Sequence, residues 1–386
     1  MKNVLIVNQS AELYGADRII LELILNFPND YTPIVVLHED GPLKKILEEK
    51  GIQIIHCSVI KVKRGILGLN FFLKLPFEII KSFSTIKKEL KGKKIDLVHS
   101  NATSVFIGAF YSFFFRKKHL WHVHEIIEQP KFLANAYPQI VNFFSDKIVY
   151  NSKATYLNFF NRKRSIQKKS VIVYNGQERN IPIIESERNS IRQEKLKIFD
   201  DTIVIGLVGR ISKLKGQIFL LNAFYDLQKK YDNIHLVFVG SPPPSKEFLL
   251  TDLIEKIDFF QLQSKVTIID FQENIWPIYD ALDILTVPSI EPESFGLVAT
   301  EGMLSYKPII ASNHGGLAEI VVDNVTGALF VPNNKEDLKQ KLIQLIESPS
   351  LIKEYGLNGN QRVKEVFSTK KYVSGIKTIY DTLSNS

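Results

Sequence analysis

Residues Pro288–Met303 read PSIEPESFGLVATEGM, and this stretch decides how the fold is interpreted. The apolar run Ile284–Pro288 is typical of a buried strand, and the proline and glutamate residues that follow it indicate a turn. A helix is expected to begin near Ser294 or Phe295. A buried strand, a turn and a helix in this order form the repeating unit of a parallel α/β sheet.

The same alternation continues through the second half of the chain. Strands are expected at Thr202–Val208, His235–Val239, Lys265–Ile268, Ile284–Pro288, Pro308–Ala311 and Ala328–Val331. Helices are expected between these strands and at Lys335–Ile346, Ser348–Phe367 and Thr369–Leu383. The strand segments are apolar almost throughout, without strict alternation, which is typical of strands buried on both faces of a parallel sheet.

The first half of the chain shows the same rhythm. Strands are expected at Val4–Asn8, Thr32–His38, Gln53–His56, Asp96–Ser100, His119–His124, Lys147–Tyr150 and Ser170–Tyr174. The whole pattern predicts an α/β fold made of two Rossmann-like, doubly wound domains. Because ligands of such sheets bind at the carboxyl ends of the strands, we expect the two domains to face each other across a cleft that holds the site.

Domain boundaries follow from the length and from one break in this rhythm. A chain of 386 residues is too long for one ordinary core. The segment from Asn175 to about Asp200 contains Pro182 and a charged run, so it is interpreted as a linker. We expect an N-terminal domain at residues 1–180 and a C-terminal domain at residues 181–368. The last helix, residues 369–386, is expected to pack back on the N-terminal domain.

The bulk composition is that of a globular protein, with 45% hydrophobic and 23% charged residues. The single cysteine, Cys57, excludes an intrachain disulfide and fits a reducing compartment. No export signal is recognised at the N-terminus. The longest apolar run, Val105–Phe115, is shorter than the ~20 residues that a spanning helix needs. We therefore expect a cytoplasmic protein without a transmembrane helix.

The net charge of +8 is unevenly distributed along the chain. Residues 1–199 carry 31 Lys and Arg against 18 Asp and Glu, whereas residues 200–386 carry 18 against 23. A basic first half indicates an anionic partner for that half.

One basic segment, Ile60–Lys94, stands out because it mixes ten Lys or Arg residues with many apolar ones. Apolar residues follow helical spacing at Ile66, Leu69, Leu73, Phe77 and Ile80. Such a basic amphipathic helix, which Pro76 would kink, fits peripheral contact with an anionic membrane. The alternative is a crossover helix that packs on its own sheet with solvated lysines.

Two carboxylates accompany the helix expected after the opening strand. Glu293 would lie just before the helix N-terminus, and Glu301 about two turns inside it, near the same face. The N–H groups at such a start form an anion site suited to a diphosphate, here at Ser294, Phe295 and Gly296. Glu301 would accept hydrogen bonds from ribose hydroxyls, and Glu293 from sugar hydroxyls. Taken alone, the pair fits two solvated helix glutamates equally well.

A second element carries the resemblance to a known family. Gly209-Arg210 ends the first strand of the second half and is followed by Lys213-Leu214-Lys215-Gly216. Together with the helix of Glu293 and Glu301, this resembles the retaining glycosyltransferases of family 4, or glycosyltransferase group 1, over essentially the full chain. The resemblance implies the GT-B fold and a donor diphosphate bound by Arg210 and Lys215. Two cations at a strand-to-helix turn can neutralise a leaving diphosphate.

The loop after the first strand resembles the same family. Tyr14-Gly15-Ala16-Asp17-Arg18 occupies the place of a loop in which the family usually has two glycines and a glutamate. Gly15 would bring its backbone N–H close to phosphate. Tyr14 stands in the place of one glycine and Asp17 in the place of the glutamate. The Tyr14 departure bears on the loop shape and on the access of the acceptor.

Histidines end the fifth strand, in the sequence Trp121-His122-Val123-His124-Glu125. The resemblance implies that His124 lies beside the donor sugar. His122 is interpreted as structural. A metal site formed by His122, His124 and Glu125 is the alternative, which the alternating directions of strand side chains disfavour.

A last group of motifs is interpreted as determining the fold. His314-Gly315-Gly316 leads into Leu317-Ala318-Glu319-Ile320-Val321, and Asn324-Val325-Thr326-Gly327 follows. These resemble the glycine-rich and Glu-Ile-Val stretches of the family. The glycines would permit a tight turn from strand to helix.

The expected reaction uses neither a metal nor another cofactor. No Asp-x-Asp triplet occurs in the sequence, so protein cations and helix dipoles would neutralise the leaving diphosphate. The resemblance implies retention of anomeric configuration, with His124 and Glu293 positioning the sugar. We expect transfer of a hexose-type sugar from a nucleoside diphosphate sugar to a saccharide or a lipid-linked saccharide, in bacterial surface polysaccharide synthesis on the inner face of the plasma membrane.

Two other functions remain open from the sequence. A sugar-nucleotide 2-epimerase shares the two-domain fold but needs acid and base carboxylates, and no convincing set is found. A non-catalytic protein that binds nucleotide or nucleic acid would use the basic half. The apolar residues of that half follow helical spacing, which disfavours nucleic acid. UDP, GDP, ADP and dTDP all remain possible donor nucleotides.

Overall fold

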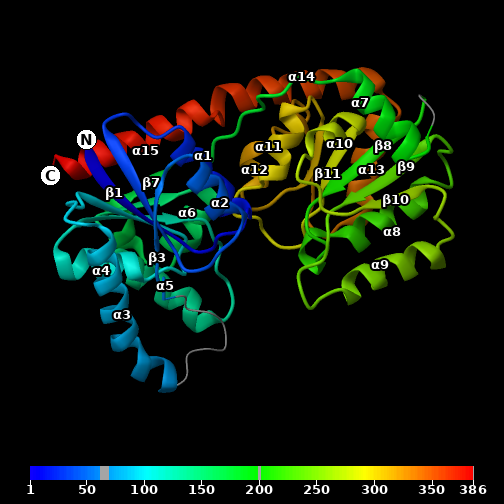
Figure 1. Ribbon diagram of the computed structural model, residues 1–386. Coiled ribbons are helices and arrows are strands. Elements are labelled where there is room, and N and C mark those ends of the chain that lie inside the picture. The colour runs from blue at the N-terminus through cyan, green and yellow to red at the C-terminus, as the bar shows by residue number, and fades with distance from the viewer. Residues whose placement is uncertain (61–68, 199–200, 386) are drawn as a thin grey trace. The chain divides into compact units, whose positions relative to one another are not determined.

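The computed structural model describes residues 1–60, 69–198 and 201–385, which form two compact units. Unit 1 comprises Met1–Gln177 and the C-terminal segment that starts at Phe367, and unit 2 comprises Glu178–Val366. Each unit is a sheet flanked by helices (Figure 1). The predicted α/β class and the two doubly wound domains are confirmed.

Unit 1 contains one sheet of seven parallel strands in the order β3-β2-β1-β4-β5-β6-β7. The strands are β1 (Lys2–Asn8), β2 (Tyr31–Leu37), β3 (Gln53–His56), β4 (Leu97–Asn101), β5 (Lys118–Val123), β6 (Lys147–Tyr150) and β7 (Ser170–Ile172). β1, β2, β4, β5 and β6 are mostly buried, as their near-continuous apolar sequences predict, whereas the edge strand β3 is only partly buried. The order reverses between β1 and β4, which are neighbours at the centre.

The helices of unit 1 form two layers. Helix α1 (Gly15–Leu25) contacts α2 (Pro42–Glu49) and α15 (Thr369–Ser384), which lies against β4 and β5. The other layer is a series of neighbours: α3 (Leu69–Glu89), α4 (Ile107–Phe115), α5 (Lys131–Phe144) and α6 (Lys153–Phe160). A short 3₁₀ helix at Arg164–Lys169 precedes β7.

Helix α3 covers most of the basic segment singled out in the sequence. Residues 61–68 of that segment, with Ile66, lie outside the described residues. The helix runs from Leu69 to Glu89 with Pro76 inside it, and its first turns project away from the rest of unit 1 (Figure 1). Within the described part of the chain, no helix is both long enough and apolar enough to span a bilayer.

Unit 2 contains six parallel strands in the order β10-β9-β8-β11-β12-β13. They are β8 (Ile203–Val208), β9 (Ile234–Val239), β10 (Val266–Ile269), β11 (Ile284–Val287), β12 (Ile309–Ser312) and β13 (Gly327–Phe330). The helices are α7 (Glu185–Ser190), α8 (Gln217–Leu227), α9 (Phe248–Phe259), α10 (Trp276–Ala281), α11 (Leu297–Leu304), α12 (Leu317–Ile320), α13 (Lys335–Ile346) and α14 (Pro349–Val366). A 3₁₀ turn at Lys213–Lys215 follows β8.

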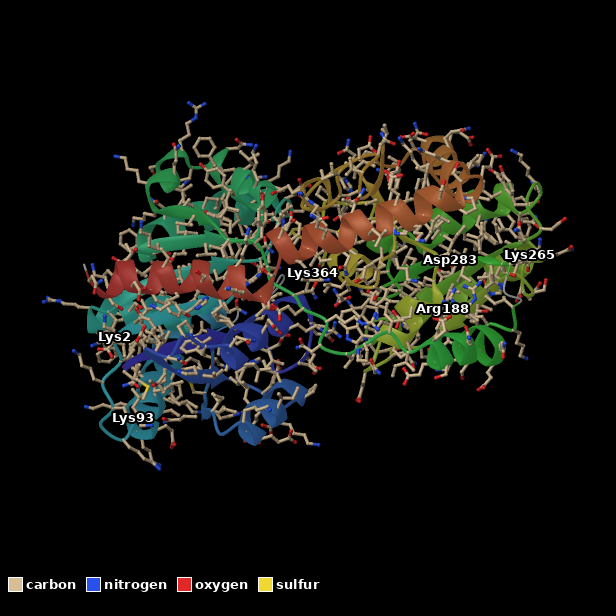
Figure 2. All side chains as sticks on the ribbon, turned by 90° about the horizontal axis from the view of Figure 1, so that it is seen from above. Lys2, Lys93, Arg188, Lys265, Asp283 and Lys364 are labelled. Atoms are coloured by element: carbon tan, nitrogen blue, oxygen red, sulfur yellow. The ribbon has the colours of Figure 1, made fainter. Side chains whose placement is uncertain are left out.

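The segment expected to be a linker is partly helical, because α7 continues into a π-helical turn at Ile191–Lys195. Two buried arginines attach it to unit 2. Arg179 donates to both carboxylate oxygens of Asp280, at 2.5 and 2.6 Å. Arg192 donates to Asp283, which is labelled in Figure 2, at 3.0 Å. No local sequence pattern predicts these long-range ion pairs, so only the short charged run was visible.

Substitution of Tyr380 tests how α15 stabilises unit 1. Tyr380 is fully buried and its hydroxyl lies 2.7 Å from Nδ1 of His99 in β4. We expect Tyr380→Ala to lower the free energy of unfolding of unit 1 by about 3–5 kcal/mol, because it leaves a cavity. The sequence contains two tryptophans, Trp121 in unit 1 and Trp276 in unit 2.

Urea unfolding of variants that keep one tryptophan each measures the two units separately. In Tyr380→Ala, the unfolding transition reported by Trp121 should move to a lower urea concentration. The transition reported by Trp276 should stay in place. An equal shift of both transitions would show that α15 does not stabilise unit 1 in particular.

Candidate functional site

The candidate donor residues of unit 2 follow β8 and β11, which are neighbours at the centre of its sheet. The chain winds outward from β8 through β9 to β10 on one side, and from β11 through β12 to β13 on the other. Loops that leave two such strands diverge, and the point where the strand order reverses is where doubly wound sheets bind ligands. Arg210 and Lys215 follow β8, and Glu293 follows β11.

Direct backbone contacts join these two loops. The N–H of Ile290 donates to the carbonyl oxygen of Leu214 at 2.8 Å. Gly216 has φ +78°, and a Cβ there would lie 2.2 Å from the carbonyl oxygen of Pro288. No other residue type fits this position without displacing a loop. The loops after β8 and β11 are therefore held together as one surface.

An ion pair reinforces this junction. Nζ of Lys215 lies 2.7 Å from Oε1 of Glu293, and the hydroxyl of Ser289 donates to the same oxygen. Burial alone would raise the pKa of Glu293. The charge of Lys215 and the hydrogen bonds from Lys215 and Ser289 outweigh it, so the pKa is lowered. Glu293 is thus an ionised carboxylate near neutral pH, suited to accept hydrogen bonds and unsuited to donate a proton.

Helix α11 begins later than the sequence indicated. Its first residue is Leu297, and Gly296, with φ +117°, is the N-cap. The expected start at Ser294 or Phe295 is wrong, because the left-handed conformation of Gly296 delays the helix. Glu293 therefore lies in the turn before the helix, and Glu301 lies in its second turn.

Glu301 is nearly buried, with 5% of its surface exposed. The hydroxyl of Tyr279, in α10, donates to its Oε2 at 2.7 Å. This contact leaves a carboxylate with a fixed orientation rather than a mobile surface group. A solvated helix glutamate, the alternative considered from the sequence, does not describe Glu301.

The glycine pair after β12 fixes the turn that carries Glu293. The N–H of Gly316 donates to the carbonyl oxygen of Glu293 at 2.7 Å. Gly315 has φ +61°, and a Cβ there would lie 2.3 Å from the same oxygen. These glycines thus let the loop after β12 pack directly on the backbone of the candidate site.

In unit 1, a buried carboxylate organises the loop after β1. Gly15 is the first residue of α1, and Asp17 accepts hydrogen bonds from the N–H of Tyr14 at 3.2 Å and the hydroxyl of Ser10 at 2.6 Å. The amide of Asn8 also donates to Asp17, at 2.8 Å. The contact with Tyr14 forms part of a capping box, which stabilises the start of the helix. Asp17 therefore has a structural role in this loop. Its departure from the family pattern did not reveal this role.

His124 comes directly after β5 and is almost buried. Its Nε2 lies 2.7 Å from Oδ1 of Asn101, the last residue of β4. Burial lowers the pKa of His124 to about 3, so the ring is neutral near neutral pH. A neutral imidazole can position a hydroxyl group but supplies no positive charge.

His122 and Glu125 have different surroundings from His124. His122 is fully buried, and the centre of its ring lies 4.0 Å from that of His124 in a tilted arrangement. Its nitrogens have no hydrogen-bond partner in the described residues. The carboxylate of Glu125 accepts from the N–H groups of Thr103 and His124. Across residues 1–60, 69–198 and 201–385, no cluster of three His, Cys, Asp or Glu side chains is arranged to hold a metal ion.

Comparisons with known proteins give matches over most of the chain. The family model "Glycosyl transferases group 1" matches residues 188–362. An uncharacterized glycosyltransferase from Methanocaldococcus jannaschii is 28% identical over 349 residues, which cover 88% of this chain and 87% of that protein. A second from the same organism is 30% identical over 288 residues, or 70% of each chain.

The chain belongs to the group 1 glycosyl transferases. Another relative, the capsular polysaccharide biosynthesis glycosyltransferase CapM of Staphylococcus aureus, is 27% identical over 196 residues, which cover 51% of this chain and 50% of CapM. Among solved structures, HepE of Anabaena in complex with UDP and glucose superposes with a TM-score of 0.84 at 22% identity, covering 99% of this chain and 100% of HepE. The fold is that of the GT-B glycosyltransferases.

In this glycosyltransferase, the site residues expected from the sequence form two sets. Unit 2 carries one set on the loops after β8 and β11 and on α11: Arg210, Lys215, Glu293, Ser294, Phe295, Gly296 and Glu301. Of these, Lys215 and Glu293 are in direct contact. Phe295 is only 3% exposed, so its backbone rather than its ring is available to a ligand. Gly15 and His124 lie at the carboxyl edge of the unit 1 sheet.

The sequence alone missed four side chains that hold these residues: Asn8, Asn101, Tyr279 and Ser289. Asn8 and Asn101 did give a signal, because each is a polar residue at the end of a buried apolar strand. Tyr279 and Ser289 gave none, since an aromatic residue in a helix and a serine in a turn are common.

Substitution of Gly315 tests whether the glycine pair holds the Glu293 turn. Gly51 is a matched control, because it has φ +69° and a Cβ there meets nothing within 4 Å. Each Gly→Ala change costs about 1–2 kcal/mol for the left-handed backbone. Gly315→Ala should cost a further 1–3 kcal/mol or so from overpacking. Urea unfolding measures both losses, with Trp276 as the reporter for Gly315→Ala in unit 2 and Trp121 as the reporter for Gly51→Ala in unit 1. Equal losses in the two variants would contradict this reading of Gly315.

Proposed function

We propose that this glycosyltransferase is a retaining, metal-independent enzyme that transfers a hexose-type sugar from a nucleoside diphosphate sugar to a saccharide or lipid-linked saccharide. The observation that carries the proposal is the ion pair of Lys215 and Glu293, which joins the loops after β8 and β11. The UDP and glucose bound to HepE support a nucleotide-sugar donor. The relative CapM supports a role in bacterial surface polysaccharide synthesis.

The donor diphosphate is bound by cations and backbone dipoles of unit 2. Arg210 and Lys215 lie in the loop after β8, and the first N–H groups of α11 follow Gly296. Negative charge grows on the diphosphate as the glycosidic bond breaks, so donors fixed in advance stabilise the transition state. Glu301, oriented by Tyr279, accepts hydrogen bonds from the ribose hydroxyls.

Glu293 and His124 position the sugar, because each accepts a hydrogen bond from its hydroxyl groups. The bond from the anomeric carbon to the diphosphate oxygen breaks, and the acceptor hydroxyl oxygen bonds to that carbon on the same face. The acceptor proton passes to the departing phosphate oxygen. No protein nucleophile is needed, and the anomeric configuration is retained.

The stereochemical course is tested by following the anomeric proton of the product by NMR from the start of the reaction. A retained configuration is expected. An inverted product anomer would overturn the mechanism. A changed sugar in the absence of acceptor would instead indicate a 2-epimerase.

Two substitutions in unit 2 should affect different kinetic constants. Arg210→Ala should lower kcat by roughly 100-fold or more, because charge develops on the phosphate in the transition state. Glu301→Ala should mainly raise the KM for the donor, because ribose is bound equally in the ground state and the transition state. Lys213→Ala is the control, since Lys213 is an exposed cation of the same loop. Unchanged kinetics in both site variants would contradict the assignment.

We further propose that α3 binds the cytoplasmic face of an anionic plasma membrane. Three apolar side chains on α3 are about two-thirds exposed and follow helical spacing: Leu73, Phe77 and Ile80. Exposed lysines, Lys74 and Lys81, accompany them. A helix that exposes an apolar stripe beside cations fits the interface of an anionic bilayer, where the stripe is buried and the lysines meet headgroups.

Vesicle co-sedimentation tests this contact. The triple variant Leu73→Ser, Phe77→Ser, Ile80→Ser should lose roughly tenfold or more in affinity for vesicles that contain phosphatidylglycerol. Phe259→Ser is the control, because Phe259 is 75% exposed but lies in unit 2. Equal binding of the triple variant and the control would refute a role of α3, and equal binding to pure phosphatidylcholine would refute the anionic preference.

A further inference from the structure

A continuous chain of buried polar side chains connects the loop after β1 with His124. Asn101 donates through Nδ2 to Oδ1 of Asn8 at 2.7 Å, and Asn8 donates through Nδ2 to Asp17 at 2.8 Å. The other end of Asn101, Oδ1, lies 2.7 Å from Nε2 of His124. Asn8 and Asn101 are paired across β1 and β4, and neither is exposed to solvent.

Asp17 determines the direction of every hydrogen bond in this series of buried side chains. Its carboxylate accepts from the hydroxyl of Ser10 and the N–H of Tyr14, so it acts as an acceptor toward Asn8 as well. Asn8 must therefore present its NH₂ group to Asp17 and its carbonyl oxygen to Asn101.

Asn101 is oriented in turn by Asn8. Its NH₂ group donates to Asn8 and also to the carbonyl oxygen of Ala16 at 3.2 Å. Only its carbonyl oxygen remains to face His124. A carbonyl oxygen accepts and never donates, so Nε2 of His124 must carry a proton.

We propose that Asn101 is a positioning residue that holds His124 in the Nε2–H tautomer and leaves Nδ1 to accept a hydrogen bond from a sugar hydroxyl. The tautomer follows from unit 1 alone, whereas the sugar contact rests on the proposed function. Nδ1 of His124 has no hydrogen-bond partner among the described residues. A ring held neutral by its buried environment keeps the lone pair on Nδ1.

The tautomer is measured directly by ¹⁵N NMR of histidine-labelled protein, in which protonated and bare ring nitrogens have distinct shifts. The His124 signals are assigned by their loss in His124→Gln. The wild-type protein should show a proton on Nε2 and a bare Nδ1. A proton on Nδ1 would overturn the proposal without any variant and without any activity assay.

Two asparagine substitutions separate positioning from general stability. Asn101→Leu keeps the side-chain volume but removes the acceptor for Nε2. Asn151→Leu is the control, because Asn151 is also a buried asparagine of unit 1, and its side chain accepts from Thr155 rather than contacting His124. Both variants are first checked for folding through Trp121 fluorescence.

Only Asn101→Leu should mix the two tautomers of His124 and lower kcat, by roughly tenfold or more, with a smaller change in donor KM. An unchanged tautomer in folded Asn101→Leu would refute the role of Asn101. The wild-type protein could also show the expected NMR signals and yet be inactive with every nucleoside diphosphate sugar. That result would support the tautomer and refute the proposed function instead.

Discussion

Parallel strands cannot be joined by tight turns, and this constraint decides where the candidate site residues lie. Each strand needs a crossover helix, and the loops that enter these helices all leave from the carboxyl edge of the sheet. Where the winding reverses, two neighbouring strands send their loops in opposite directions. In unit 2 these strands are β8 and β11, and in unit 1 they are β1 and β4. The loops that carry Lys215 and Glu293 in unit 2 and the loop of Gly15 in unit 1 occupy these points.

The two units hold their polar residues by different physical means. Unit 2 uses an ion pair, in which the attraction between Lys215 and Glu293 offsets the burial of the carboxylate. In unit 1, two amides connect the buried carboxylate of Asp17 to the ring of His124, where burial disfavours the charged form of the ring. A charged pair suits a surface that meets a diphosphate. A neutral ring suits a surface that must orient hydroxyl groups without attracting ions.

The sequence predicted the fold well because buried parallel strands have an unambiguous apolar pattern, and all thirteen strands of the described structure coincide with expected segments. It predicted the start of α11 less well, because the left-handed turn at Gly296 depends on packing against Leu317 in α12. Arg179 and Asp280 are far apart in sequence, so no local pattern could pair them. The family motifs singled out Lys215 and His124 as candidates, whereas their contacts with Glu293 and Asn101 emerged only from three-dimensional proximity.

Unit 2 is formed by one continuous stretch of chain, whereas unit 1 is completed by α15, which follows it in sequence. During synthesis on the ribosome, the seven strands of unit 1 emerge first, but the helix that covers β4 and β5 emerges after all of unit 2. The unit that starts first therefore finishes last. Until then, buried faces of its central strands are exposed, and a nascent chain at this stage is a substrate for chaperones and proteases.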